Sequence, residues 1–520
     1  MTTVGFNLTE HCLSPSPARP DDDVALIHAT PSGATTLTWR QARRRTGAIQ
    51  AALVNTGVRP GSRVLIALPS SPDYALAFLA ITGLGAIAVP ASPQLTPPEL
   101  ATIAHDCSPA VILTDRERHE ALRAEHLAGG TLLLACAIDD ELATADAPLI
   151  HTRDPEQPAY LVYTSGTTGR PRGVLHAHRS VAARAIMRAS WTGIARGDRV
   201  LHASELNWTY AMGISVLDAW PVGASTVIWT GPREATRWPE LIAAHGVTIF
   251  AAGPGVYRQL LARALERGDE RLTSLRHALT AGEALPPALL AAWTTTTGVA
   301  LHEALGMSEC STFISSGPSV PVRPGSPGRI QPGRHVGALD QEAAAQGRAH
   351  QAPVGTVGIL AIRSDEPGLM LGYRAPDGSI DLPLTDGWFL TGDLVETGPD
   401  GYVRYLGRRD EVLNALGYRV SPLEVEAALE GNPDVREVAV TAVRVRADLE
   451  LVCAWVVATD SDAAARLSHE ALDRWCRERL AAFKCPRVFR LVTALPRTRT
   501  GKIQRGALET VAFTELERPG

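Results

Sequence analysis

The segment 163–174, which reads YTSGTTGRPRGV, concentrates groups that can hold an anion. Glycine permits positive φ angles and lets the backbone approach a ligand closely. Neighbouring N–H groups and hydroxyls can then surround phosphate oxygens. The segment is not a GxxxxGK[ST] phosphate loop, and the pair Gly501-Lys502 has no glycine five residues upstream. The residues predicted to contact phosphate are Thr164, Ser165, Gly166, Thr167, Thr168 and Gly169.

A short apolar run at 159–163 leads directly into this segment and predicts a buried strand. Helical patterns separate it from similar runs elsewhere in the chain. These runs are at 63–68, 110–114, 199–203, 224–229, 247–251 and 276–280. The alternation predicts βαβ units, and so an α/β fold in which mostly parallel sheets are covered by helices.

One almost uncharged stretch, 74–89, is shorter than the about 20 residues that span a membrane. Gly83 and Gly85 interrupt it, and Pro90 ends it. We therefore predict a buried helix over 73–82, a tight turn and a buried strand. The chain begins without a basic region followed by an apolar core, so we expect a soluble, cytoplasmic protein.

After about residue 407 the pattern changes. Two β-rich runs, 438–445 and 451–459, flank a short polar stretch and predict a hairpin. A helix is expected over 469–480 and a strand over 487–492. The sequence therefore predicts two domains, a large N-terminal domain over 1–408 and a small α+β domain over 409–520.

The composition excludes several classes of protein. Lys and Arg number 50 and Asp and Glu number 55, so the formal net charge is −5. This slightly acidic balance disfavours a dedicated nucleic-acid-binding protein. The seven cysteines include no CxxC pair, so neither a zinc cluster nor a disulfide framework is expected. We expect neither a nucleic acid nor a membrane among the partners.

The segment 163–174 resembles the phosphate loop of the adenylate-forming superfamily, which includes acyl-CoA synthetases, peptide-synthetase adenylation domains and luciferases. Further segments match the family in order, and the resemblance covers about residues 35 to 505. They are AGEALP at 281–286, LGMSE at 305–309, TGD at 391–393, GRRD at 407–410 and PRTRTGKI at 496–503. The resemblance implies a small mobile C-terminal domain and a two-step reaction. A carboxylate attacks ATP to give an acyl-adenylate and pyrophosphate, and a thiol, usually CoA, then displaces AMP.

By this resemblance, the backbone at Gly282 and Glu283 lines the adenine, and Ser308 contacts the nucleotide. Glu309 is expected to be catalytic and to hold the Mg²⁺ that accompanies ATP, because Mg²⁺ prefers oxygen ligands and bridges to phosphate. Leu305 departs from the family pattern, which often has an aromatic residue stacked on adenine. This departure weakens one stacking contact but not the chemistry.

The resemblance assigns the remaining polar residues to the nucleotide and to the movement between domains. Asp393 is expected to hold the ribose, since a carboxylate accepts from both hydroxyls of a diol, with Arg408 assisting. Asp410 matches the hinge, where a few residues absorb a backbone change. Arg419 is a candidate phosphate contact. Lys502 is the expected catalytic lysine, because charge placed where negative charge develops lowers the barrier.

Within the family, the chain is most similar to the benzoate–CoA ligase branch, through GYRVSP at 417–422 and FKCPR at 483–487. The tunnel for the pantetheine arm of CoA is expected at Trp208, Gly417 and Tyr418. The acyl pocket carries over to Thr209, Tyr210, Ala281, Gly306 and Phe313.

Two residues distinguish this pocket from that of benzoate ligases, which tend to have alanine where Thr209 stands and isoleucine where Phe313 stands. Both changes add bulk or polarity. We predict a compact pocket for a small, benzoate-type aromatic acid that bears a hydroxyl or amine near Thr209 or Thr312. A small aliphatic or alicyclic acid is the alternative, and Phe313 disfavours longer chains.

Other members of the family and one other class remain to be weighed. Amino-acid adenylation domains usually anchor the α-amine with an aspartate in the segment 205–210, which has none. An acyl-AMP ligase that loads a carrier protein in trans shares the first step and stays open. A catalytically silent nucleotide-binding regulator is disfavoured by intact Lys502, Glu309 and Asp393. The sequence therefore predicts an AMP-forming acid–thiol ligase that uses ATP, Mg²⁺ and CoA, in a branch where homodimers are common.

Overall fold

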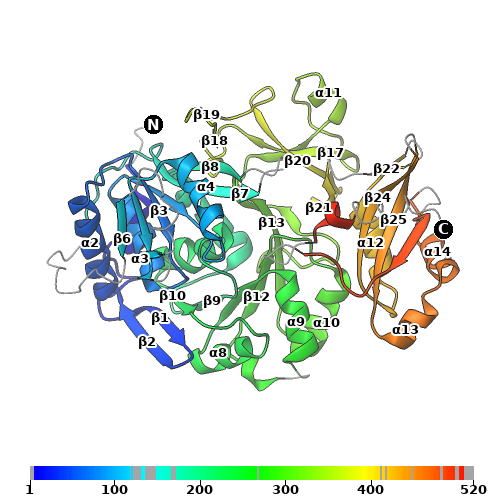
Figure 1. Cartoon of the computed structure of the whole chain (residues 1–520), viewed down its shortest axis with the longest axis horizontal. Helices are drawn as coiled ribbons and strands as arrows, with labels where there is room; N and C mark the ends of the chain where they lie inside the picture. Colours follow the sequence, from blue (N-terminus) through cyan, green and yellow to red (C-terminus); the bar gives the residue numbers. More distant parts are fainter. Residues whose placement is uncertain are drawn as a thin grey trace.

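Two large sheets and a smaller C-terminal unit make up the protein (Figure 1). The computed structural model describes residues 5–116, 119–120, 131–134, 148–165, 171–265, 269–409, 413–415, 418–446, 449–480, 484–497 and 503–508. Within these ranges no helix is long and apolar enough to cross a membrane.

Within the part of the chain that the structure describes, the larger sheet contains thirteen strands. From one edge to the other they are β16 (Val336–Leu339), β17 (Val357–Arg363), β20 (Trp388–Thr397), β21 (Tyr402–Arg408), β15 (Gly328–Ile330), β14 (Ser311–Ser315), β13 (Leu301–Met307), β12 (His277–Ala281), β11 (Ile249–Ala252), β9 (Arg199–His202), β10 (Ser225–Trp229), β1 (Val24–Thr30) and β2 (Gly33–Thr38). The strands from β13 through β12, β11, β9 and β10 to β1 are parallel.

The smaller sheet contains eight strands. Their order is β19 (Ile380–Asp381), β18 (Gly372–Arg374), β8 (Pro171–Ala177), β7 (Pro158–Ser165), β4 (Ile87–Pro90), β3 (Arg63–Ala67), β5 (Val111–Thr114) and β6 (Thr131–Leu134). Strands β7, β4, β3, β5 and β6 run parallel, whereas β8, β18 and β19 continue the sheet with antiparallel pairs.

The helices fill the space around and between these sheets (Figure 1). In the N-terminal part they are α1 (Leu8–Leu13), α2 (Trp39–Asn55), α3 (Pro72–Gly83), α4 (Pro97–Cys107), α6 (Arg179–Met187), α7 (Thr209–Met212), α8 (Arg237–His245), α9 (Pro254–Arg263), α10 (Pro287–Thr297) and α11 (Gln341–Ala345). Two π-helical turns, η3 (Arg188–Thr192) and η4 (Gly213–Asp218), and two 3₁₀ turns, η5 (Trp220–Val222) and η6 (Glu270–Leu272), complete them.

Helix α3 lies between the two large sheets, and the structure confirms the predicted buried helix. Its residues are buried along almost its whole length. One hydrophobic cluster joins Phe78 of α3 to Ile66 of β3 in the smaller sheet and to Val200 of β9 in the larger. Gly85 then takes a φ of +68°, which makes the tight turn into β4. The apolar stretch therefore serves as the shared core of the two sheets.

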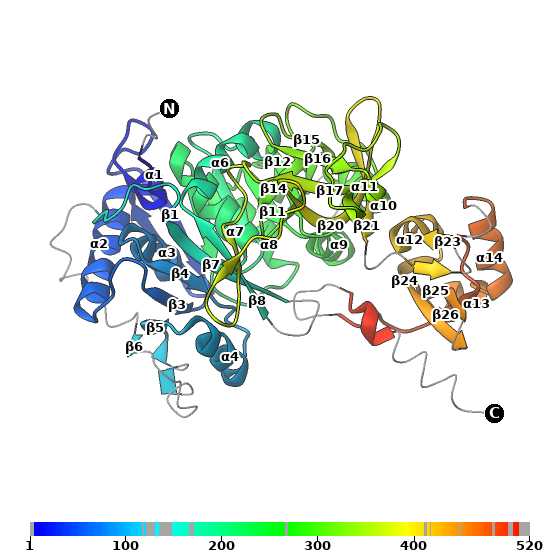
Figure 2. The same ribbon diagram turned by 90° about the horizontal axis from the view of Figure 1, so that it is seen from above.

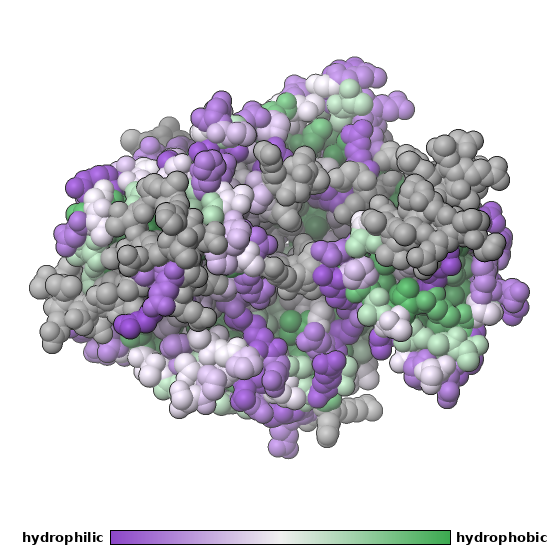
Figure 3. Space-filling view, viewed as in Figure 1, coloured by the Kyte–Doolittle hydropathy of each residue, from purple (hydrophilic) through white to green (hydrophobic). Residues whose placement is uncertain are grey.

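The C-terminal unit has its own core and stands at one end of the larger body (Figure 2). Strands β24 (Val435–Arg446) and β25 (Leu449–Ala458) form the predicted antiparallel hairpin, and β26 (Val488–Leu491) adds a parallel strand. The other elements are β22 (Leu413–Ala415), β23 (Tyr418–Val420), α12 (Pro422–Glu430), α13 (Ser461–Arg466) and α14 (His469–Arg477). Figure 3 shows hydrophobic side chains gathered on this unit, whereas much of the remaining visible surface is hydrophilic.

The structure confirms an α/β fold with a separate C-terminal domain, but the sheets are mixed rather than mostly parallel. From β13 onward the larger sheet grows by antiparallel pairs, through β14, β15, β21, β20, β17 and β16. Antiparallel strands are joined by short turns and need no crossover helix. The alternation of strands and helices in the first 280 residues therefore did not reveal them.

Candidate active site

The predicted phosphate segment forms part of a β-hairpin. Strand β7 pairs antiparallel with β8, with Thr164 opposite Arg172. The Thr164 hydroxyl donates to the Arg172 carbonyl at 3.4 Å. For Ser165 only the backbone is described, and Gly166, Thr167, Thr168 and Gly169 lie outside the described residues. The pairing of β7 with β8 nevertheless fixes the positions of the two ends of the phosphate segment.

The turn that carries Ser308 and Glu309 contacts this hairpin. It joins β13 to β14, and His176 of β8 donates from Nε2 to the Ser308 carbonyl at 2.8 Å. The Tyr373 hydroxyl donates to Glu309 Oε1 at 2.8 Å. The guanidinium carbon of Arg172 lies 3.3 Å from the centroid of the Tyr373 ring. The structure therefore brings together the phosphate hairpin and the acidic turn, which are more than 130 residues apart in sequence.

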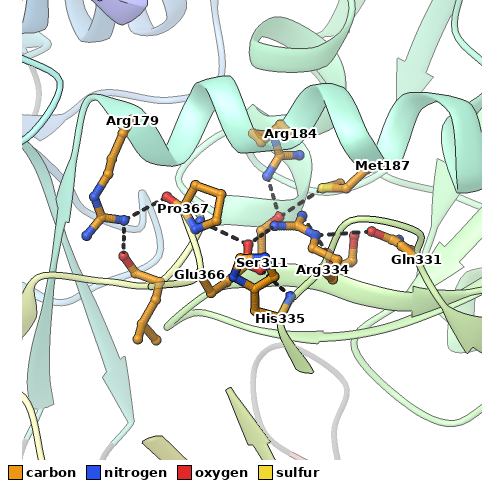
Figure 4. A network of polar contacts seen from close by, with 12 residues as sticks. Arg179, Arg184, Met187, Ser311, Gln331, Arg334, His335, Glu366 and Pro367 are labelled. Atoms are coloured by element: carbon orange, nitrogen blue, oxygen red, sulfur yellow. Dashed lines mark hydrogen bonds and ion pairs between the residues drawn. The ribbon is translucent and has the colours of Figure 1, made fainter. Parts of the chain in front are cut away.

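A network of buried polar contacts fixes the far side of this turn (Figure 4). Arg184 binds both carboxylate oxygens of Asp218, at 2.7 and 2.8 Å, and donates to the Ser311 hydroxyl at 2.5 Å. Arg334 donates to the Thr312 carbonyl at 2.8 Å and to Glu366 Oε1 at 2.6 Å. Both side chains of the Arg334–Glu366 pair are fully buried.

The segment around residues 366–370 is held by the same network. Glu366 Oε2 accepts from the His335 backbone N–H at 2.8 Å. Arg179 donates to the Pro367 carbonyl at 2.7 Å, as Figure 4 shows, and to the Leu369 carbonyl at 2.8 Å. The Met370 N–H in turn donates to the Glu309 carbonyl at 2.8 Å. The position of Glu309 is therefore fixed from both sheets.

The predicted adenine segment begins where β12 ends. Gly282 has a φ of +96°, and both Gly282 and Glu283 are exposed. Behind this turn lies Glu303 of β13, which is 8 % exposed and accepts the Leu285 N–H at 2.9 Å. Burial raises the pKa of Glu303 to about 7. We did not identify Glu303 from the sequence, although an acidic residue within the apolar run LHEAL was a usable signal.

Asp393 and Arg408 face each other across β20 and β21. Arg408 Nη1 lies 3.7 Å from Asp393 Oδ1 and donates to the Thr391 carbonyl at 2.8 Å. The Tyr405 hydroxyl donates to Asp393 Oδ1 at 3.1 Å. Burial raises the pKa of Asp393, while the nearby Arg408 opposes that shift. The pair forms a fixed, polar corner where β21 ends beside the middle of β20.

A pocket that is partly open to solvent lies beside the acidic turn. Trp208, Thr209 and Ser308 are among its lining residues. Apolar side chains, including Phe78 and Met212, form much of the rest. The structure therefore brings two residues predicted for acid and CoA binding next to one predicted for the nucleotide.

The other predicted acyl residues are not among the residues that line this pocket. Tyr210 stacks on Trp191 and contacts His202 edge to face, with ring centroids 5.7 and 4.3 Å apart. Ala281 belongs to the central core cluster, and Phe313 to a second cluster. Gly306 packs so closely on β14 that an added Cβ would lie 2.2 Å from the Ser311 carbonyl oxygen. A glycine is therefore required there by packing alone.

The C-terminal predictions fall largely outside the described residues. Asp410, Gly417 and Lys502 lie there, and for Tyr418 and Arg419 of β23 only the backbone is described. In the described ranges, no group of three or more His, Cys, Asp and Glu side chains could hold a metal ion. A carboxylate such as Glu309 can still supply one oxygen ligand to a Mg²⁺ ion that arrives with phosphate.

Two family models match the chain. One described as AMP-binding enzyme covers residues 14–374, and one described as AMP-binding enzyme C-terminal domain covers residues 424–502. The chain is 32% identical over 485 residues to a 3-hydroxybenzoate–CoA ligase of Aromatoleum sp. (strain CIB), covering 91% of each protein. It is 30% identical over 497 residues to a 3-hydroxybenzoate–CoA/4-hydroxybenzoate–CoA ligase of Thauera aromatica, covering 92% of this chain and 93% of the relative.

Solved structures resemble the whole chain as well. The anthranilate CoA ligase AuaEII in complex with anthranoyl-AMP has a TM-score of 0.86 and 30% sequence identity, covering 98% of both chains. A benzoate CoA ligase from Burkholderia xenovorans LB400 has a TM-score of 0.83 and 27% identity, covering 97% of this chain and 100% of that one.

The buried Glu303 generates a prediction about stability. Glu303→Gln is expected to raise the free energy of unfolding at pH 8 by roughly 2–3 kcal/mol. The folded pKa of about 7 exceeds the ordinary value of 4.5, so only the folded state keeps its proton between these values. Stability conferred by that proton is full below pH 4.5 and falls as pH rises toward 7. Glutamine keeps the acceptor for Leu285 and carries no charge.

Unfolding by urea at pH 8 and at pH 5 measures this difference. The advantage of Glu303→Gln should shrink toward zero as the pH falls to 4.5. Glu283→Gln, on an exposed side chain of the neighbouring turn, is the control and should change stability little at either pH. An equal advantage of Glu303→Gln at both pH values would contradict the burial argument.

Proposed function

The chain belongs to the AMP-binding enzyme family, and on that premise we propose that it is an aryl-CoA ligase for a small, benzoate-type acid. In the first step, a carboxylate oxygen of the acid attacks the α-phosphorus of ATP. An acyl–phosphate bond forms, the α–β phosphoanhydride bond breaks, and pyrophosphate leaves. In the second step, the CoA sulfur attacks the acyl carbonyl carbon, and AMP leaves as the thioester forms. A small aliphatic or alicyclic acid is the alternative substrate.

One observation carries this proposal: Ser308 lines the apolar pocket and also belongs to the turn that contacts the phosphate hairpin. An acid in the pocket and a nucleotide on the hairpin would then meet at one residue. Holding two reactants in a productive arrangement supplies a large part of a catalysed rate. The relatives described above, which are CoA ligases for hydroxybenzoates, anthranilate and benzoate, support an aromatic acid.

The nucleotide would lie across the ends of both sheets. Thr164–Gly169 would hold the phosphates, Gly282 and Glu283 the adenine, and Asp393 with Arg408 the ribose. Arg419 would add a phosphate contact from the C-terminal domain. Glu309 would hold the Mg²⁺ that accompanies ATP, and the ion would neutralise phosphate charge. The Tyr373 hydroxyl orients the Glu309 carboxylate for that role.

The acid and the thiol would approach from the pocket side. Thr209, Tyr210, Ala281, Gly306 and Phe313 would shape the acyl site, with Thr209 in direct contact because it lines the pocket. Trp208, Gly417 and Tyr418 would line the path of the pantetheine arm. We place the domain boundary between residues 408 and 409 and the hinge at Asp410.

Lysine usage supports the role proposed for Lys502. The chain holds 50 lysines and arginines, and only Lys484 and Lys502 are lysines. Lys484 is paired, donating to Glu424 Oε1 at 2.6 Å. Arginine presents a planar fork, whereas lysine is a compact point charge. A lysine retained at 502 in so arginine-rich a chain fits a need for an ammonium group at the reacting phosphate.

Pyrophosphate release with MgATP across a panel of small carboxylic acids tests the proposal. We expect strong, CoA-dependent turnover on benzoate-type acids and weak turnover on aliphatic and alicyclic acids of similar size. Release that stops after about one turnover and ignores CoA would instead indicate a carrier-protein thiol as acceptor. No release with any aromatic acid would refute the aryl-CoA ligase.

The two half-reactions separate the role of Lys502. Lys502→Ala and Lys502→Arg should lower adenylation of acid and ATP by about 10²- to 10³-fold, as loss of one charge-stabilising donor typically does. Both variants should still convert supplied acyl-adenylate and CoA to thioester. Lys484→Arg keeps the pair with Glu424 and is the control, with both half-reactions intact. Equal loss of both half-reactions in Lys502→Ala would contradict the assignment.

A further inference from the structure

Two buried hydrogen-bond acceptors in the pocket have no partner. The first is Nδ1 of His176, whose side chain is 2 % exposed. Its other ring nitrogen, Nε2, lies 2.8 Å from the Ser308 carbonyl oxygen. A carbonyl oxygen only accepts, so Nε2 carries the proton and Nδ1 is a bare lone pair. Burial lowers the pKa of His176 to about 4, which keeps the ring neutral at physiological pH.

The second acceptor is Oδ1 of Asn207. This oxygen is buried, and within the described ranges it accepts no hydrogen bond from protein. Asn207 lies two residues before Thr209, and both side chains line the pocket. Asn207 therefore borders the same space as the residue proposed to touch the acid.

Arg184 and Ser180, two other polar side chains of the pocket, are already engaged. Arg184 is bound by Asp218 and donates to Ser311, as Figure 4 shows for Arg184 and Ser311. Ser180 donates to the Ala177 carbonyl at 2.8 Å and contacts the Tyr160 hydroxyl at 3.0 Å. Among the described lining residues, the buried side-chain atoms that lack a partner are therefore both acceptors.

Unpaired buried acceptors have an energetic consequence. A buried polar atom without a partner costs free energy, and a ligand that donates to it removes that cost. A site built to hydrogen-bond a substrate hydroxyl or amine rejects the analogue that lacks it, because the polar group of the site is then left unpaired. Unpaired acceptors at this pocket therefore favour a ligand that carries an O–H or N–H donor.

We propose that Asn207 and His176 select acids that carry a hydroxyl or amino substituent on the ring. The inference rests on the proposed function and deepens it by naming the substrate class and its determinants. The shared chemistry is an uncharged hydrogen-bond donor, which could also come from an amide of the pantetheine arm. The donor is assigned to the acid because Asn207 adjoins the proposed acyl residue Thr209.

The test is ATP–pyrophosphate exchange without CoA, using hydroxybenzoates and the fluorobenzoates substituted at the same ring positions. Fluorine is similar in size to hydroxyl and cannot donate. The wild-type protein should prefer at least one hydroxybenzoate over its fluoro partner. Asn207→Leu should lower that ratio of kcat/KM by about tenfold, the loss expected for one hydrogen bond. Asn207→Asp keeps an acceptor oxygen and should retain most of the ratio.

A variant of His176 tests the proposal independently of Asn207. His176→Gln can keep the donor to the Ser308 carbonyl through its Nε2 while removing the Nδ1 acceptor. It should therefore also lower the hydroxy-to-fluoro ratio. If Asn207→Leu does not fold, as judged by its melting temperature, the ratio in His176→Gln still decides the matter.

The outcomes separate the inference from the proposed function. If the wild-type protein shows no exchange with any benzoate, the proposed function fails. If it exchanges benzoates but does not prefer hydroxyl over fluorine, or if the variants leave the ratio unchanged, the inference alone fails. Equal loss in Asn207→Leu and Asn207→Asp would mean that shape rather than hydrogen-bond acceptance matters, and would overturn it. A change confined to the KM for CoA, independent of the acid, would assign the donor to pantetheine and also overturn it.

Discussion

The turn that joins β13 to β14 is the constraint on which the site depends. It lies where the two large sheets meet, and both sheets contact it. His176 of the smaller sheet binds the Ser308 carbonyl, and Tyr373 of the same sheet binds the Glu309 carboxylate. Ser311 is bound on its far side by Arg184. Neither sheet alone would set the position of Glu309.

Two buried ion pairs provide the rigidity behind this turn. Arg334–Glu366 is fully buried, and Arg184–Asp218 is almost so. Such a pair adds little net stability, because desolvation offsets the attraction, but removal of one partner commonly costs about 3–5 kcal/mol. Both pairs satisfy their remaining hydrogen bonds with Thr312, Ser311 and the 366–368 backbone. The main effect of the two ion pairs is therefore to hold the turn in a single conformation.

Local patterns predicted much of the fold. The run around Leu76 and Phe78 is long and apolar, and glycine and proline follow it. This pattern predicts a buried helix. The hairpin of β24 and β25 followed from two β-rich runs around a polar turn. The antiparallel half of the larger sheet was not predicted, because strands as short as β15 and β16 carry little periodicity.

The candidate site could be predicted only where residues form a continuous motif. Ser308 and Glu309 stand in such a motif, and so do Asp393 and Arg408. Glu303, His176 and Asn207 do not, since their roles depend on burial and on which hydrogen bonds remain unmade. His176 presents a lone pair on Nδ1 because its Nε2–H donates to the carbonyl of Ser308, which is 132 residues away. The residue spacing within β8 cannot predict a hydrogen bond to a turn so far away in the sequence.

The central claim is that this turn presents Ser308 and Glu309 to the nucleotide and the neighbouring pocket to the acid. A crystal structure with a hydroxybenzoyl sulfamoyl adenosine, a stable mimic of the acyl-adenylate, tests it most directly. The account predicts ribose hydroxyls on Asp393, the sulfamoyl group beside Ser308, and the aryl ring against Thr209 with its hydroxyl toward Asn207. An aryl ring bound away from this pocket, or a ribose away from Asp393, would contradict the account.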